Sequence, residues 1–450
     1  MQTLFESPLR AISSKNDQYF KSDSYYKSYT LRNFKSIPHI QQLTTAQIEA
    51  IEVVGRIFPF KTNNYVVEKL IDWQRVPDDP IFVLNFPQKG MLKPRQYEKM
   101  AQLLKTGAGK KEIEHAAMEI RWELNPHPAG QGLNMPTHNG IKLRGSQHKY
   151  RESILFFPSQ GQTCHAFCTF CFRWPQFVGM NEIKFAMQET KLLIDYIRQH
   201  PEITDLILTG GDPLVMKTRV FAKYIDPLLK ANIRHLKTIR IGTKALSYWP
   251  NRFVTDADSE ELLDLFNKIT RYGKHLAIMG HFNHPREMAP EVVKEAIQRV
   301  RETGAEIRTQ SPLLNHINNR PELWANMWQA QVELGCIPYY MFVVRDTGAQ
   351  HFFGVNLDDA WNVFRKAYQK VSGLARTVRG PSMSAHPGKI LVNGVSEIQG
   401  EKVFVLQFLQ GRNPDWAGRP FFAKYNRSAK WLTDLQPAFN QERFFFEADK

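Results

Sequence analysis

From about residue 152 onward, short apolar segments alternate along the chain with amphipathic segments of helical length. Parallel strands need a crossover connection, usually a helix, so this succession predicts an α/β fold with a parallel sheet. The even spacing of six units favours a partial (β/α)6 TIM-like barrel, and an open doubly wound sheet is the alternative. The predicted strands are 152–158, 204–210, 236–242, 275–282, 305–311 and 337–344. The predicted helices are 182–200, 219–231, 259–272, 290–303, 321–334 and 357–371.

Different patterns flank these units. The segment before them mixes helical patterns with Pro-rich stretches, and residues 125–136 have the composition of a linker. The segment after them contains KILVNGVSEIQGEKVFVLQF, which predicts a hairpin or a pair of strands. The helices predicted before the six units are 45–57, 94–106 and 111–124. The chain therefore divides into a mostly helical N-terminal extension (1–147), the six-unit region (148–372) and a strand-containing C-terminal extension (373–450).

Composition excludes several classes of protein. The 450 residues are 42% hydrophobic and 12% aromatic, which is enough for a packed core, and four cysteines do not make a disulfide scaffold. The first residues are polar and interrupted by Pro8, unlike a signal peptide, and no apolar run approaches the ~20 residues that span a bilayer. We therefore expect a cytoplasmic protein with reduced thiols and no membrane partner. The net charge of +15 would suit nucleic acid, but the basic residues form only short clusters such as Lys110–Lys111.

Polar, glycine-rich or histidine-bearing segments follow all six predicted strands. In parallel barrels the residues that carry out chemistry lie in loops at the carboxyl ends of the strands. This convergence is the main indication of an active site that the residues alone provide. The segments are QTCHAFCTFCFRWPQF (162–177), GGDP (210–213), GTK (242–244), HFNHP (281–285), QSPLLNHINN (310–319) and RDTGAQHFF (345–353).

Three of the four cysteines, Cys164, Cys168 and Cys171, lie in the first of these segments with the spacing C-x3-C-x2-C. Three thiolates from one loop can hold three irons of a four-iron cluster and leave the fourth iron open for another ligand. A structural zinc site would need a fourth ligand, such as His165 or a distant residue. A redox pair of Cys168 and Cys171 would leave Cys164 without a role. We favour the iron–sulfur cluster, with zinc and thiol chemistry as alternatives.

An aromatic residue, Phe170, directly precedes the last cysteine, and the loop resembles the signature of the radical S-adenosylmethionine (SAM) enzymes. The resemblance implies a [4Fe–4S] cluster whose open iron binds SAM. It also implies cleavage of SAM to a 5′-deoxyadenosyl radical that abstracts a hydrogen atom from the substrate, with electrons from a donor such as flavodoxin or ferredoxin. Gly210, Gly211 and Asp212 resemble the glycine-rich element with which these enzymes receive the SAM amino group.

Over roughly residues 75–392 the chain further resembles the lysine 2,3-aminomutase family. The resemblance implies SAM contacts at His281 and Gln310. It also implies that Arg173 grips the substrate α-carboxylate, a role that suits the planar guanidinium fork, and that Asp346 helps to hold the distal amine of the substrate. The segments that carry the resemblance are DPIFVLNFP (79–87), HKYRESILFF (148–157), LTGGDPL (208–214), RIGTK (240–244), HFNHP (281–285), QSPLLNHIN (310–318) and ELGCIPYYMFVVRD (333–346).

The same family carries pyridoxal 5′-phosphate (PLP) on a lysine after a Pro-Gly-rich turn, and HPGKILVNG places Lys389 at that position. A lysine that forms an imine needs an enclosed pocket in which its amine can lose its proton. By the resemblance, PLP then holds the substrate amine while the nitrogen migrates between adjacent carbons.

The chain departs from the family pattern at the substrate and PLP end. Only Pro387–Gly388 precedes the lysine, where the family has a run of glycines. Lys149 and Arg151 stand in a shifted arrangement where the family has arginines for the PLP phosphate, and Ser153 occupies one of the arginine positions. The second acidic residue that reads a lysine side chain is missing from the neighbourhood of Ser382–Ala385. These departures indicate that the substrate is not lysine itself.

The leading hypothesis is a radical SAM, PLP-dependent 2,3-aminomutase that acts on a small amino acid. A second hypothesis keeps SAM but not PLP, and gives a radical enzyme that acts on another small molecule or on a macromolecule such as a protein lysine or RNA. A third is a zinc- or cluster-stabilised binding protein without turnover, which would not need polar residues at all six strand ends. Self-association into a homo-oligomer is compatible with each.

Overall fold

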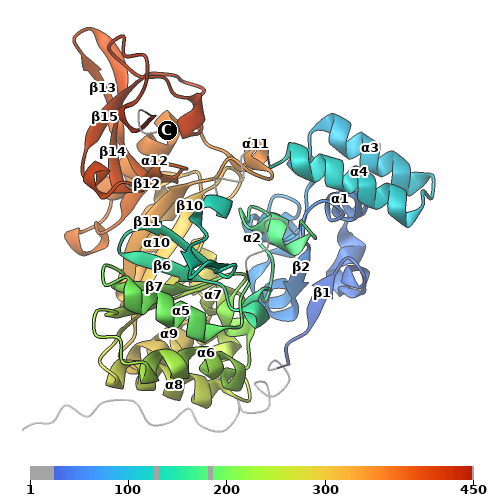
Figure 1. Ribbon diagram of the computed structural model, residues 1–450. Helices are drawn as coiled ribbons and strands as arrows, with labels where there is room; N and C mark the ends of the chain where they lie inside the picture. Colours follow the sequence, from blue (N-terminus) through green and yellow to red (C-terminus); the bar gives the residue numbers. More distant parts are fainter. Residues whose placement is uncertain (1–24, 126–130, 181–185, 448–450) are drawn as a thin grey trace, which may run out of the picture.

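The computed structural model describes residues 25–125, 131–180 and 186–447, and its centre is an eleven-stranded sheet (Figure 1). The strand order is β15-β14-β13-β12-β11-β10-β9-β8-β7-β6-β5. All six predicted strands are present, and each pairs in parallel with the next. They are β6 (Ser153–Phe156), β7 (Asp205–Leu208), β8 (Thr238–Thr243), β9 (His275–His281), β10 (Glu306–Leu313) and β11 (Ile337–Val343).

A helix follows each of these strands, as the alternation predicts. In Figure 1 several of them lie together below strands β6 and β7. The start predicted for the first helix falls outside the described residues. No helix in the described ranges is long and apolar enough to cross a membrane. The helices are α5 (Thr190–Gln199), α6 (Thr218–Lys230), α8 (Ser259–Arg271), α9 (Glu291–Glu302), α10 (Pro321–Glu333) and α12 (Leu357–Gln369).

The sheet is open at both edges. From β6 to β12 (Arg379–Ser384) each strand lies beside the next one in sequence, so the order does not reverse as it does in a doubly wound sheet. Strand β5 (Ser146–Tyr150) pairs antiparallel with β6 at one edge, and β15 (Pro420–Lys424) forms the other. The α/β class is therefore confirmed, whereas the described strands close no barrel. Apolar periodicity reports which residues are buried, and closure depends on the curl and stagger of the whole sheet.

Alternation within the strands separates a packed face from a polar face. In β8, Ile239 and Ile241 are fully buried, while Arg240 between them is half-buried. Strand β10 repeats the pattern, with Arg308 and Gln310 on the more open face. Because successive side chains of a strand point to opposite faces, the second face of the sheet carries polar groups along its length. This face lines the cavities described below.

The N-terminal region contains the three predicted helices: α1 (Thr45–Val54) and α3 (Pro94–Lys105) end slightly earlier than expected, and α4 (Lys110–Glu123) begins and ends one residue earlier. Helix α1 begins at a capping box in which Thr44 and Gln47 satisfy each other's backbone N–H groups. Figure 1 shows α3 and α4 on the opposite side of the molecule from the C-terminal strands. The sequence patterns did not predict the short helix α2 (Pro80–Asn85) or strands β1 (Ser28–Thr30) and β2 (Lys61–Asn63).

The C-terminal region contains the predicted hairpin, β13 (Gly388–Ile398) and β14 (Glu401–Gly411). Gln399 and Gly400 at its tip both have positive φ, 53° and 76°, as a two-residue turn of this kind requires. Strand β12 joins the hairpin to β11, so the C-terminal strands extend the same sheet. The domain boundaries at 147/148 and 372/373 stay predictions.

Candidate active site

A cavity of about 210 Å³ lies at the carboxyl ends of strands β7 to β10. All three clustered cysteines line it, together with every residue that the resemblance assigned to SAM. We call it the cysteine pocket. Loops that are distant in sequence therefore meet at one place, as the polar strand ends predicted. The predicted residues in its lining are Cys164, Cys168, Cys171, Arg173, Gly210, Gly211, Asp212, His281 and Gln310.

The three thiols share one buried environment. Burial raises the pKa of Cys164 and Cys171, and it raises the pKa of Cys168 to about 12. Cys171 and Cys168 further raise the pKa of Cys164, so the thiols lie close enough to oppose one another's ionisation. A metal group that binds thiolates would supply the missing positive charge.

The three cysteines line one cavity. In the parts of the chain that the structure describes, no three His, Cys, Asp or Glu side chains are grouped to hold a single metal ion. His165, the fourth ligand considered for zinc, is buried with its Nδ1 atom unpartnered, and burial lowers its pKa to about 3. Three thiols from one loop fit a four-iron cluster that keeps one iron open, whereas a structural zinc ion would need His165 or another residue as its fourth ligand.

The GGD segment passes against the cysteine loop at close range. Gly210 has a φ of +146°, a conformation that favours glycine. A Cβ atom on Gly211 would lie 2.2 Å from the carbonyl oxygen of Thr163. The backbone N–H of Asp212 donates to the same oxygen, at 2.6 Å. Gly211 is therefore required for the close approach of two backbones, and Gly210 for its positive φ.

The Asp212 carboxylate is occupied within the protein. It accepts hydrogen bonds from the Thr243 hydroxyl at 2.8 Å, from the backbone N–H of Lys244 at 2.8 Å and from the backbone N–H of Leu214 at 3.0 Å. These hydrogen bonds connect the segment after β7 to the end of β8 at the cysteine pocket. The SAM contact assigned to Asp212 by resemblance stays a prediction.

A buried ion pair supports the next strand end. The Lys244 ammonium lies 2.6 Å from the Glu287 carboxylate, whose side chain is 0% exposed. Lys244 also donates to the Asn283 side chain at 3.0 Å and to the His281 carbonyl at 3.2 Å. Burial lowers the pKa of His281 well below its usual value, and the Nε2 atom of this neutral ring is unpartnered. The GTK and HFNHP segments thus form one network that holds His281 at the pocket.

The N-terminal region also holds the cysteine loop. Lys61 donates to the carbonyl oxygen of Cys164 at 2.6 Å, and the Tyr26 hydroxyl donates to the carbonyl oxygen of His165 at 2.7 Å. The Asn63 side chain donates to the same His165 oxygen at 3.3 Å. No sequence pattern predicted these contacts, because they join residues more than a hundred positions apart and outside any repeating pattern.

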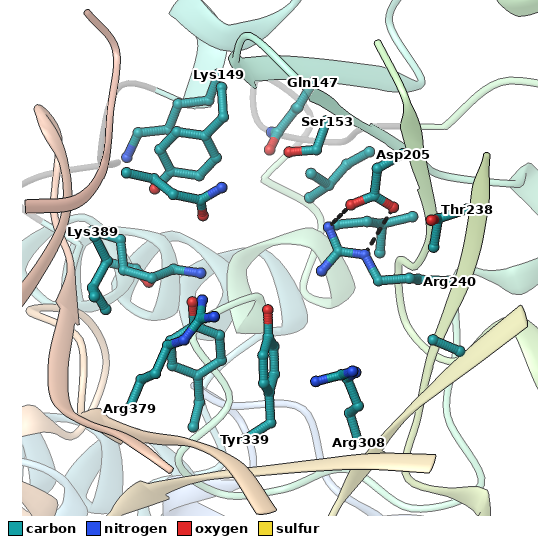
Figure 2. A pocket seen from close by; sticks show the side chains of 18 of the residues that line it. Gln147, Lys149, Ser153, Asp205, Thr238, Arg240, Arg308, Tyr339, Arg379 and Lys389 are labelled. Carbon is teal, nitrogen blue, oxygen red and sulfur yellow. Dashed lines mark hydrogen bonds and ion pairs between the residues drawn. The ribbon is translucent and has the colours of Figure 1, made fainter. Parts of the chain in front are cut away.

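A second cavity, of about 580 Å³, lies at the other end of the same strands (Figure 2). It is lined near the amino ends of β7, β8 and β12, for example by Asp205, Thr238 and Arg379. We call it the basic cavity. Asp205, the one Asp or Glu in its described lining, forms a two-point ion pair with Arg240. The cations in the lining are Lys149, Arg173, Arg240, Arg308, Arg345, Arg379 and Lys389.

Lys389 points into the basic cavity from strand β13 (Figure 2). Its Nζ atom lies 4.2 Å from the centroid of the Tyr340 ring. Burial, with Arg240 and Arg379 nearby, lowers the pKa of Lys389 to about 8. Lys149 lies in the same cavity and donates to the Ala385 carbonyl, and burial among the surrounding cations lowers its pKa to about 6. Both amines therefore lose their protons more readily than a surface lysine.

The remaining predicted residues are placed differently. Arg173 lines both cavities. Asp346, assigned to the distal amine of the substrate, is not among the described residues that line the cavities, whereas its neighbour Arg345 is. Arg151 is exposed. Sequence reasoning gave no role to Arg345, although it begins the strand-end segment 345–353, because the role at that position was assigned to Asp346. It missed the inward-facing arginines because it considered strand ends only. Arginines within otherwise apolar predicted strands were the signal.

Comparison with known proteins shows the family of this chain. No protein-family model matches it. Over 404 residues it is 30% identical to a putative L-lysine 2,3-aminomutase of Aquifex aeolicus, a match that covers 90% of this chain and 95% of that protein. The chain belongs to the lysine 2,3-aminomutase-like family of radical SAM enzymes.

Other relatives agree with this family. The L-lysine 2,3-aminomutase of Escherichia coli is 30% identical over 242 residues, covering 52% of this chain and 66% of that protein. The glutamate 2,3-aminomutase of Clostridioides difficile is 30% identical over 295 residues, covering 59% and 66%. Among solved structures, a radical SAM methyltransferase from Sphaerobacter thermophilus matches 54% of this chain and 68% of its own, with 13% identity and a TM-score of 0.36. The match to the Aquifex aeolicus protein over 95% of its length confirms the resemblance at the level of the family.

Proposed function

We propose that this radical SAM enzyme is a PLP-dependent 2,3-aminomutase that moves an amino group between adjacent carbons of a small amino acid. One observation carries the proposal. The amine of Lys389, with its pKa lowered to about 8, points into a basic cavity that adjoins the cysteine pocket. A lysine that links to a carbonyl group needs this environment, because only the neutral amine attacks.

The two cavities adjoin at Phe172 and Arg173, which line both. A third cavity, also about 210 Å³, includes Phe172 and Arg345 together with His281 and Gln310 of the cysteine pocket. A substrate at this junction would lie between the Lys389 amine and the three cysteines. Arg173, two residues after Cys171, is positioned there to orient a carboxylate.

The residues present fit the three groups that the family uses. Cys164, Cys168 and Cys171 would hold the cluster, and Lys389 would hold PLP, with the cations of the basic cavity available for its phosphate. When bound, the cluster and SAM supply a carbon-centred radical, and PLP holds the migrating nitrogen. The protein itself fixes the two sites at opposite ends of one set of strands and keeps the amine of Lys389 ready to lose its proton.

The position of the basic cavity favours a small-molecule substrate over a macromolecule. Its lining comes from the polar face of the sheet and from strand β13, and it contains inward-facing side chains of β7, β8, β10 and β11. A protein or RNA substrate would have to present one group deep within this enclosure.

The test is anaerobic reconstitution with iron, sulfide and PLP, followed by incubation with SAM, dithionite and single amino acids. We expect 5′-deoxyadenosine, and a β-amino acid formed from one of the amino acids, detected by mass spectrometry. Lys389→Ala should abolish the β-amino acid, while the matched control Lys402→Ala, an exposed lysine on strand β14, should not. A β-amino acid produced at an unchanged rate by Lys389→Ala would refute the proposal.

A further inference from the structure

Two guanidinium groups converge on one aromatic ring at the junction of the cavities. The guanidinium carbon of Arg173 lies 5.1 Å from the centroid of the Phe172 ring, and that of Arg345 lies 4.8 Å from it. The two guanidinium carbons can therefore be no farther apart than these two distances added together. Phe172 is 37% exposed and lines all three cavities, so both cations border space that a ligand can enter.

Acidic partners for a cationic ligand are scarce at this place. In the basic cavity, Asp205 is the one carboxylate among the described lining residues, and it is bound to Arg240. The third cavity has Arg345 and Ser384 but no acid in its described lining. Burial lowers the pKa of Arg345, and Asp346 opposes that shift in part, yet Asp346 is not among the described residues that line these cavities. A ligand at the junction therefore meets guanidinium groups.

Arg345 lies where the junction meets the cysteine pocket. It follows the carboxyl end of strand β11, where it shares a cavity with His281 and Gln310 of the cysteine pocket. Arg379, by contrast, begins strand β12, and its guanidinium is near enough to the Lys389 amine to lower the pKa of that amine. Cations such as Arg379 are positioned for a group held near Lys389. Arg345 is positioned for the end of a substrate that extends toward the radical source.

We propose that the substrate is an acidic amino acid, with one carboxylate on Arg173 and the side-chain carboxylate on Arg345. This inference rests on the proposed aminomutase function and specifies its substrate class. An acidic amino acid carries two carboxylates a few bonds apart, which matches two cations that share one ring. Each guanidinium can form a charge-assisted, two-point contact with a carboxylate.

The ammonium group of a lysine substrate would instead face Arg345. Like charges in a partly desolvated site repel, and the described lining offers no free carboxylate to offset that repulsion. The arrangement therefore selects against lysine as well as for an acidic side chain. Glutamine, which has the shape of glutamate without its charge, separates these two effects.

The test is calorimetric binding to PLP-loaded protein without SAM, using L-glutamate, L-aspartate, L-glutamine and L-lysine. We expect glutamate or aspartate to bind roughly tenfold to a hundredfold more tightly than glutamine, the usual range for a charge-assisted contact. Arg345→Gln should bring the ratio of glutamate affinity to glutamine affinity near one. Arg345→Lys should keep part of the preference for glutamate. The control Arg365→Gln, an exposed arginine on helix α12, should leave it unchanged.

Two results would overturn the inference. The first can be obtained with the wild-type protein alone. One is lysine binding as tightly as either acid. The other is an Arg345→Gln protein that loses its PLP, which would assign Arg345 to the cofactor phosphate. Because binding is measured without turnover, the proposed function fails separately. Preferential binding of acidic amino acids without amino-group migration would refute the proposed aminomutase function. Migration on lysine without binding of acidic amino acids would refute only the role proposed for Arg345.

Discussion

The cysteine pocket and the basic cavity lie at opposite ends of the same parallel strands, and they are built in different ways. The pocket is made of loops, in which short runs such as GGDP carry neighbouring functional residues. The basic cavity is made of single side chains, such as Arg240 and Arg308, each from a different strand. A loop site leaves a contiguous motif in the sequence, whereas a strand-face site leaves isolated residues at alternate positions.

Removing one cysteine gives the largest expected difference between the two sites. Cys168→Ala should lose cluster iron and reduce SAM cleavage below detection, because three thiolates are the minimum that holds the cluster in this loop. PLP bound at Lys389 should remain, since Cys168 does not line the basic cavity. Iron analysis and 5′-deoxyadenosine release measure the first effect, and PLP absorbance measures the second. Cys336→Ala, a buried cysteine outside the pocket, is the control.

Lys389→Ala should give the reverse result. We expect loss of covalently held PLP and of amino-group migration, with iron content and slow SAM cleavage retained. Mass spectrometry of the reduced protein and 5′-deoxyadenosine release measure the two. If the variant also lost its iron, the sites would be one cooperative unit, and the separation described above would be wrong.

The ion pair between Lys244 and Glu287 should contribute more to stability than the pair between Arg240 and Asp205. Glu287→Gln leaves the Lys244 ammonium buried without a counter-charge, and should cost about 3–5 kcal/mol of unfolding free energy. Asp205→Asn breaks the pair with Arg240, whose side chains are 18% and 20% exposed, so water offsets part of the loss. Denaturant unfolding of both variants measures the difference. Equal losses would contradict the assignment of Glu287 as the more deeply buried support.

The pH dependence of PLP attachment should show the smallest effect. The pKa of Lys389, about 8, lies below its usual value of 10.5, and attachment needs the neutral amine. Below pH 8 the amine is protonated, so the attachment rate should rise as pH increases and level off above about pH 8. Stopped-flow absorbance at several pH values measures this. A rate that still rises steeply between pH 9 and 10.5 would indicate an ordinary lysine pKa.

The sequence predicted the strands and helices of the six-unit region because each combines a consistent apolar period with clear boundaries. The partial barrel that it favoured is not confirmed, since the curl of a sheet depends on the geometry of all its strands together. The three cysteines, Gly211 and His281 line one cavity, because loops at one end of a parallel sheet meet there, and their roles stay predictions.

The residues that sequence reasoning missed have a common physical reason. Arg345 was passed over for Asp346, because an acid was expected at that position and the direction of a side chain after a strand cannot be read from its neighbours. The arginines inside β8 and β10 were treated as part of apolar strands. Parallel strands covered on both faces read as continuous apolar runs, so an arginine within one indicates a lined cavity.

Lys389 is the attachment point that we propose for PLP, in a cavity that adjoins the cysteine pocket. Lys149 is its most direct rival, because it lies in the same cavity and its pKa is lowered to about 6. The measurement is borohydride reduction of the PLP-loaded protein, followed by digestion and mass spectrometry of the lysine-containing peptides. We predict the PLP adduct on Lys389 and an unmodified Lys149. An adduct on Lys149, or no adduct on either lysine, would contradict the claim.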